Sequence, residues 1–292
     1  MTQQEFYGRP LVRRLIEIFR QPGPPAVVTE RQFDDDQDGL ERLARKQWHQ
    51  VIPDDYWCYL MDMAYVSLQP QLFEHIFPAF LIAWWEGQLS RLDGPEAETD
   101  FYYALDRGQV LETMLHESRR EAVLDWMAEA YLDGVNAWTG PLVLEQTGDP
   151  VPPLNSFHAL GMAVPVSARI LLGLVRGSGR GIAKWWVVLG AGIAWYTAEG
   201  DFVLLESSAS IYDHGYRAEN RAAIAGVLTV KLLLERLAAA REYLTPAEQT
   251  MLAETVEMLQ ADPTGTEARL RAFLARLAEP QLGGWRPELT PP

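Results

Sequence analysis

The sequence predicts a mainly α-helical protein of two lobes, with one small β-hairpin in the second lobe. Apolar residues recur at helical spacing along most of the chain, a stretch rich in proline and glycine divides it, and two short apolar runs flank a turn. The chain has 292 residues, 48% of them hydrophobic, with ten tryptophans among them. That length and composition are enough for two packed cores.

Helical spacing is clear in the first lobe. Residues 11–20 place four apolar side chains on one face: Leu11, Leu15, Ile18 and Phe19. The prolines and glycine of residues 21–25 should end that helix. Pro78 predicts a kink or a new helix start, because proline removes one helical hydrogen bond and clashes with the preceding turn. A long helix is expected over residues 111–132.

Prolines and glycines are densest in residues 139–156, which predicts a linker there. The expected domains are therefore an acidic helical domain over residues 1–138 and a second helical domain over residues 157–292. Within the second, residues 193–205 predict a hairpin, because two apolar runs flank a four-residue turn at 198–201 that contains glycine.

The C-terminal part returns to a helical pattern. Thr245 and Glu248 predict a capping box, in which the side chain of each residue accepts a hydrogen bond from the backbone N–H of the other. Further on, apolar residues follow the stripe of an amphipathic helix: Leu270, Phe273, Leu274 and Leu277.

Negative charge is concentrated in the first lobe. Residues 1–140 contain 12 Lys and Arg against 24 Asp and Glu, whereas residues 141–292 contain 13 against 16, within a net charge of −15. Such a field repels nucleic acid and anionic membranes, and it speeds the encounter with basic proteins. The sequence therefore predicts a basic protein partner and no nucleic-acid or membrane partner, although acidity for solubility alone is the competing explanation.

Several features predict a cytoplasmic location. Cys58 is the only cysteine, so no intrachain disulfide can form. Residues 1–20 carry charges throughout and show no secretory signal. The longest apolar run, residues 185–198, is too short for the roughly 20 residues that cross a bilayer.

Two carboxylate patterns resemble metal sites but are incomplete. Residues 34–39 (Asp-Asp-Asp-Gln-Asp-Gly) match the start of a calcium loop, but Arg45 stands where the closing Glu should be. They also match an aspartate-rich diphosphate box, of which the second copy is missing. Glu112 and His116 would share one helix face, yet two ligands do not make a metal site. We therefore expect no bound metal and no cofactor.

Catalytic patterns are equally incomplete. The glycines at 177, 179 and 181 miss the spacing of a dinucleotide-binding loop, and Lys184 does not complete a phosphate-binding loop. Asp213 and His214, near Glu206 and Ser207, are the one place where acid, base and hydroxyl lie close in sequence. No catalytic residue is assigned. The alternative that remains is an enzyme or small-molecule binder with a pocket between the lobes.

Tryptophans beside acidic residues are typical of protein-binding surfaces. The predicted partner-binding residues are Asp34, Asp35, Asp36, Asp38, Trp48, Trp57, Trp84 and Trp85. Core packing is the competing explanation for the tryptophans. Adjacent tryptophans on a helix point about 100° apart, so one of each pair should be partly exposed.

Three segments carry a resemblance: residues 48–53 (Trp-His-Gln-Val-Ile-Pro), 68–73 (Leu-Gln-Pro-Gln-Leu-Phe) and 77–81 (Phe-Pro-Ala-Phe-Leu). Over residues 10–133 the chain resembles an uncharacterised family of small bacterial helical domains, although Gln69 and others depart from its motifs. The family brings no assigned activity. Its members look similar to proteins encoded beside bacterial toxins, which implies an immunity protein that binds and occludes a toxin.

Overall fold

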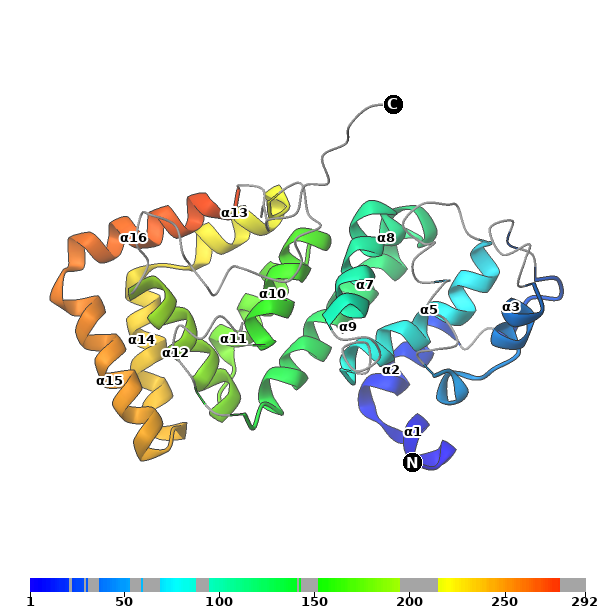
Figure 1. The fold of residues 1–292 in the computed structure, drawn as a ribbon, viewed down its shortest axis with the longest axis horizontal. Helices are drawn as coiled ribbons and strands as arrows, with labels where there is room; N and C mark the ends of the chain where they lie inside the picture. The colour runs from blue at the N-terminus through cyan, green and yellow to red at the C-terminus, as the bar shows by residue number, and fades with distance from the viewer. Residues whose placement is uncertain are drawn as a thin grey trace. The chain divides into compact units, whose positions relative to one another are not determined.

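A computed structural model gives the fold as helices joined by turns (Figure 1). It describes residues 1–20, 23–28, 30, 37–52, 59, 69–87, 95–140, 142, 152–194 and 215–278. The chain divides into two compact units, unit 1 (Met1–Ala130) and unit 2 (Tyr131–Pro292). The division falls inside one helix, α9 (Glu117–Asn136), while residues 141 and 143–151 of the predicted linker lie outside the described residues.

Unit 1 is built around one apolar helix, α5. Its elements are α1 (Gln3–Gly8), α2 (Pro10–Phe19), α3 (Gln37–Ala44), the 3-10 helix η2 (Trp48–Gln50), α5 (Pro70–Trp85), α7 (Pro95–Arg107), α8 (Val110–Met114) and the start of α9. Figure 1 shows α5 beside α2, and α5 also contacts α3 and η2. Side chains all around α5 are therefore buried.

The proline inside α5 does not end the helix. Pro70 occupies the first turn, where proline is tolerated, and the helix then continues through Pro78 to Trp85. Pro78 is itself buried, as are its neighbours Phe77 and Ala79. Burial of apolar side chains on every face offsets the cost of about 3 kcal/mol for an internal proline.

A break near His116 corrects the single helix expected over residues 111–132. Helix α8 ends at Met114, Leu115 is extended, and α9 starts at Glu117. The His116 carbonyl accepts hydrogen bonds from the N–H groups of Arg119 and Arg120, both at 2.9 Å. His116 thus begins a new helix, and Glu112 and His116 do not share a helix face as the sequence predicted.

Unit 2 surrounds helix α12. Its elements are the end of α9, α10 (Pro152–Ala163), α11 (Ser167–Arg176), α12 (Arg180–Ala194), α13 (Ala218–Val227), α14 (Val230–Ala240), the 3-10 helix η4 (Arg241–Tyr243), α15 (Pro246–Ala261) and α16 (Pro263–Arg276). Helix α12 contacts α14, α15 and α16, and every residue from Gly181 to Ala194 is buried (Figure 1).

The mainly α fold class is confirmed, but the β-hairpin predicted at residues 193–205 is wrong. Ile193 and Ala194 are the last residues of α12, and the described parts of the chain contain no strand. Residues 195–205 lie outside the described residues. The apolar run misleads because a helix buried on all sides lacks the periodicity that distinguishes helix from strand.

The predicted C-terminal helices are confirmed. Thr245 and Glu248 form the capping box at the start of α15. In the predicted stripe, Leu270 and Phe273 of α16 are buried, and so is Leu277 just after it. In the described part of the chain, no helix combines the length and apolar character needed to span a membrane.

The glycines between α11 and α12 have a packing role. Gly179 has a φ of +119°, which residues other than glycine rarely adopt. The Arg236 side chain donates a hydrogen bond to the Gly177 carbonyl at 2.8 Å. A Cβ on Gly181 would lie 1.8 Å from the Val135 carbonyl oxygen of α9. The φ of Gly179 and the close approach at Gly181 are therefore two local reasons for glycine in this loop.

Gly181→Ala should destabilise unit 2, because its methyl group would overlap backbone that cannot move aside as a flexible side chain would. We expect a loss of about 2 kcal/mol or more in the free energy of unfolding, measured by urea denaturation. Gly134→Ala is the matched control, since Gly134 lies in α9 and a Cβ there would meet nothing within 4 Å. It should gain about 0.5–1 kcal/mol. Equal midpoints for the two variants would contradict the close approach.

Candidate partner-binding surface

Trp84 and Trp48, two of the predicted binding residues, belong to the core of unit 1. Trp84 is 7% exposed, and its indole N–H donates to the Tyr102 hydroxyl at 2.7 Å. Trp48 is 4% exposed and donates to the His75 carbonyl at 2.9 Å. A residue that anchors a partner has to be accessible before binding, so core packing accounts for both rings.

Trp85, next to Trp84 on α5, is only half-buried. The Arg9 guanidinium lies over its ring, 3.9 Å from the centroid, and also pairs with the Glu86 carboxylate. The Trp126 ring meets Trp85 edge-on, with centroids 6.4 Å apart. We call Arg9, Trp85 and Glu86 the Arg9 cluster.

The local sequence places Arg9 at the joint between α1 and α2. Because Pro10 follows, the helical conformation is disfavoured at Arg9, and its backbone is extended with φ −68° and ψ 136°. Pro10 then starts α2, as prolines favour the first helical turn. The short connection fixes where the Arg9 side chain leaves the backbone.

Of the predicted acidic residues, the structure describes Asp38 alone. It is exposed and lies in the first turn of α3, where a negative charge interacts favourably with the helix dipole. Asp34, Asp35, Asp36 and Trp57 lie outside the described residues.

Five arginines of unit 1 are paired with carboxylates of the same unit. The pairs are Arg9–Glu86, Arg14–Glu129, Arg45–Glu41, Arg119–Glu74 and Arg120–Glu121. Each pair neutralises one positive and one negative charge, so the excess of acidic residues in residues 1–140, 24 against 12 basic ones, is unaffected. The paired arginines therefore leave the field of this region negative.

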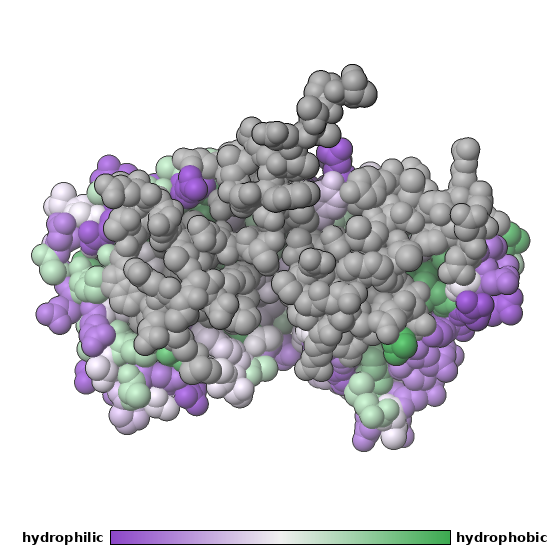
Figure 2. Space-filling view, in the orientation of Figure 1, coloured by the Kyte–Doolittle hydropathy of each residue, from purple (hydrophilic) through white to green (hydrophobic). Residues whose placement is uncertain are grey.

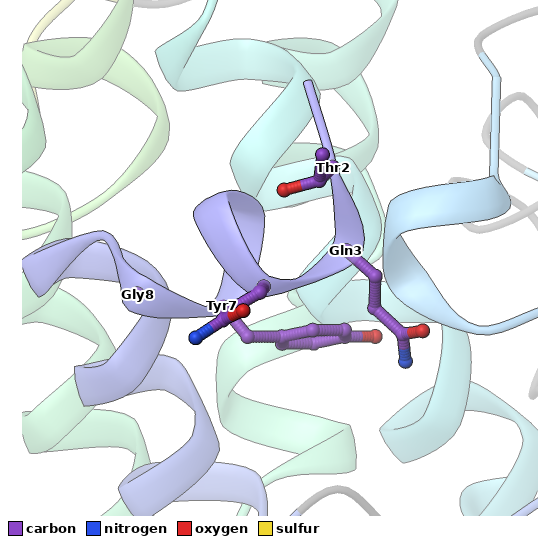
Figure 3. Close-up of a pocket in the computed structure, with 5 residues that line it drawn as sticks. Thr2, Gln3, Tyr7 and Gly8 are labelled. Carbon is purple, nitrogen blue, oxygen red and sulfur yellow. The ribbon is translucent and has the colours of Figure 1, made fainter.

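A shallow depression of about 610 Å³ lies at the N-terminus, lined by Thr2, Gln3, Gln4, Tyr7 and Gly8 (Figure 3). Figure 3 shows the Gln3 side chain reaching toward the phenol end of Tyr7. The Tyr7 hydroxyl lies 3.1 Å from His49 Nδ1, and Gln3 donates to the Gln47 side chain at 3.2 Å. The lining is uncharged and offers hydrogen bonds, which suits recognition of another surface.

Exposed large apolar side chains in the described part of unit 1 are Met1, Val27 and Ile52. In the view of Figure 2, hydrophilic side chains predominate on the described surface of unit 1, with apolar ones scattered among them. No group of three or more metal-ligating side chains occurs among the described residues.

Glu30 is a buried carboxylate that sequence analysis missed. It is 5% exposed and accepts a hydrogen bond from the Gln69 N–H at 2.6 Å. Gln69 precedes α5, so Glu30 caps that helix from a distant part of the chain. Burial raises the pKa of Glu30 by more than hydrogen bonding lowers it.

Unit 2 holds a second set of buried charges. The Lys184 ammonium is fully buried, lies 3.7 Å from Glu248 and hydrogen-bonds the Gly140 carbonyl. Arg180 binds Glu248 with two hydrogen bonds of 3.0 and 3.3 Å. Burial alone would raise the pKa of Glu248, but hydrogen bonds from Arg180 and Thr245 lower it to about 2. Burial lowers the pKa of Lys184, against the opposing effect of Glu248.

Lys184 and Arg180 thus share Glu248 as their ionic partner. Asp213, His214, Glu206 and Ser207, the residues of the alternative enzyme hypothesis, lie outside the described residues. In comparisons with known proteins, no family model, curated protein or solved structure matched the chain.

Glu30→Gln should remove a pH dependence of stability. Because the pKa of Glu30 is raised in the folded state, its contribution is fully present below the unfolded value of about 4.3 and is lost as pH rises through the folded value. The neutral amide keeps an acceptor without the cost of a buried charge. The variant should therefore gain stability over the wild type as pH is raised from 4 to 8, measured by denaturation. A difference that is constant across this range would contradict the assignment.

Glu248→Gln should behave in the opposite way. With a lowered pKa of about 2, Glu248 contributes stability that is present above its unfolded value and is lost as pH falls through about 2. Removing the charge also leaves the buried Lys184 ammonium without a counter-ion. We expect a loss of about 3 kcal/mol at pH 7 by urea denaturation. An unchanged midpoint at pH 7 would show that the carboxylate does not stabilise the fold.

Proposed function

We propose that this chain is a protein-binding protein whose unit 1 engages a basic partner. The observation that carries the proposal is the surplus of acidic residues in residues 1–140, which contain 24 Asp and Glu but only 12 Lys and Arg. A concentrated field of one sign accelerates the encounter with a partner of the opposite sign.

Two features of the structure support binding over catalysis. The buried charged groups Glu30, Lys184 and Glu248 are all held by internal partners. Among the described residues of unit 1, the Arg9 cluster and the depression beside Tyr7 and His49 are accessible, and both offer recognition chemistry. Aromatic rings and arginine are typical anchors of protein interfaces.

A toxin is the partner class that we propose to test first. The resemblance of residues 10–133 to domains encoded beside bacterial toxins is the support for this choice. Immunity proteins of this kind act by occlusion, so binding alone would neutralise the toxin and no turnover would be needed. A partner purified with the tagged protein from its native host, and the genes next to its own, would identify the candidate.

Reversing the acidic charges at Asp34, Asp35, Asp36 and Asp38 to lysine should mainly slow association. Steering acts before contact, so the association rate should fall, and added salt should slow the wild type in the same way. Surface plasmon resonance against the identified partner separates association from dissociation.

The control reverses the same number of charges in unit 2, at four exposed acidic residues: Glu242, Glu254, Glu257 and Glu267. It changes the net charge in the same direction but leaves residues 1–140 intact, so association should slow much less. Equal slowing by both variants would show a general charge effect. A partner that binds unit 2 at full affinity, or purification without any protein partner, would overturn the proposed function.

A further inference from the structure

We propose that the Arg9 cluster is a binding site for an arginine side chain of the partner, and that Arg9 occupies it in the free protein. The inference rests on the proposed function, since it names the side chain by which a basic partner would be recognised. Trp85 would supply an aromatic face and Glu86 a carboxylate, the two groups that together suit a guanidinium.

The geometry already shows a guanidinium in this place. The Arg9 carbon at the centre of the guanidinium lies 3.9 Å from the Trp85 ring centroid, a stacking distance, while one of its nitrogens pairs with Glu86. The Arg9 and Glu86 side chains remain 26% and 16% exposed, so solvent reaches the pair. Trp126 packs edge-on against Trp85 and supports its ring.

An arginine suits this site better than a lysine. The guanidinium is planar, so it can stack on an indole while its N–H groups point at a carboxylate in the same plane. A lysine ammonium is a more strongly hydrated point charge that lacks this planar fork. The site therefore selects within the class of basic partners that the negative field attracts.

Exchange of Arg9 for a partner's arginine would leave the backbone in place. The Arg9 N–H donates to the Phe6 carbonyl at 3.3 Å, and the Arg9 carbonyl accepts from Arg13 at 2.9 Å. These bonds hold the joint of α1 and α2 without the side chain. Arg9 then acts as a competitor, and the apparent affinity is lowered by the fraction of molecules in which it fills the site.

The test uses a fluorescein-labelled tri-arginine peptide as the probe, followed by fluorescence anisotropy at low salt. Arg9→Ala should bind the probe about tenfold more tightly than the wild type, because the competitor is gone. Adding Trp85→Leu or Glu86→Gln to Arg9→Ala should return binding to the wild-type level or below. The affinity for a tri-lysine probe should rise clearly less when Arg9 is replaced by alanine.

Arg14→Ala is the matched control. Arg14 also belongs to unit 1 and pairs with Glu129, so its removal changes the net charge equally without opening the Arg9 cluster. Arg9→Gln serves as a second variant that keeps a longer polar side chain if Arg9→Ala fails to fold. A gain confined to the Arg9 variants and lost with Trp85→Leu supports the inference.

Equal gains for Arg14→Ala and the Arg9 variants would overturn the inference, as would a gain that survives Trp85→Leu. Either result would show attraction by net charge alone, and it would leave the proposed function standing. Conversely, a chain without any basic protein partner would refute the proposed function even if the cluster binds tri-arginine.

Discussion

Every buried indole N–H that the structure describes needs a hydrogen-bond acceptor, and these bonds set the register of the helices. The acceptors are the His75 carbonyl for Trp48, the Tyr102 hydroxyl for Trp84, the Leu11 carbonyl for Trp126, the Tyr131 hydroxyl for Trp185 and the Leu174 carbonyl for Trp186. An unsatisfied buried N–H would cost about 1–3 kcal/mol. Because each acceptor lies on another element, sliding one helix along its neighbour would break these bonds.

The same requirement separates the roles of neighbouring tryptophans. Side chains adjacent on a helix point about 100° apart, so α5 turns Trp84 into the core and Trp85 toward its edge. Trp84 finds an acceptor inside, whereas Trp85 is covered on one face by Arg9. In α5 the partial exposure of Trp85 therefore follows from the burial of Trp84. The same expectation is wrong for Trp185 and Trp186, which are both buried because α12 is covered on all sides.

Helices with local sequence signals were predicted correctly. Features that depend on contacts between residues far apart in the sequence were not. The apolar face of residues 11–20, the Thr245 capping box and the stripe at Leu270 act within one turn or one face, so their outcome is visible in the sequence. The wrong hairpin came from α12, whose burial on all sides erases periodicity. The cap that Glu30 provides for α5 and the stacking of Arg9 on Trp85 join residues far apart in the sequence, so no local pattern predicts them.

Long-range charge and short-range stacking would divide the work of recognition between them. The field of the acidic residues acts over roughly the Debye length of 8 Å at physiological ionic strength, so salt weakens it and its effect falls on association. Stacking on Trp85 and pairing with Glu86 require contact and a partly desolvated site, so salt affects them less and they govern dissociation. An acidic surface alone would attract any basic protein. A site already shaped around the chain's own guanidinium would add the discrimination that attraction lacks, because a partner side chain would have to reproduce both contacts of Arg9 to replace it.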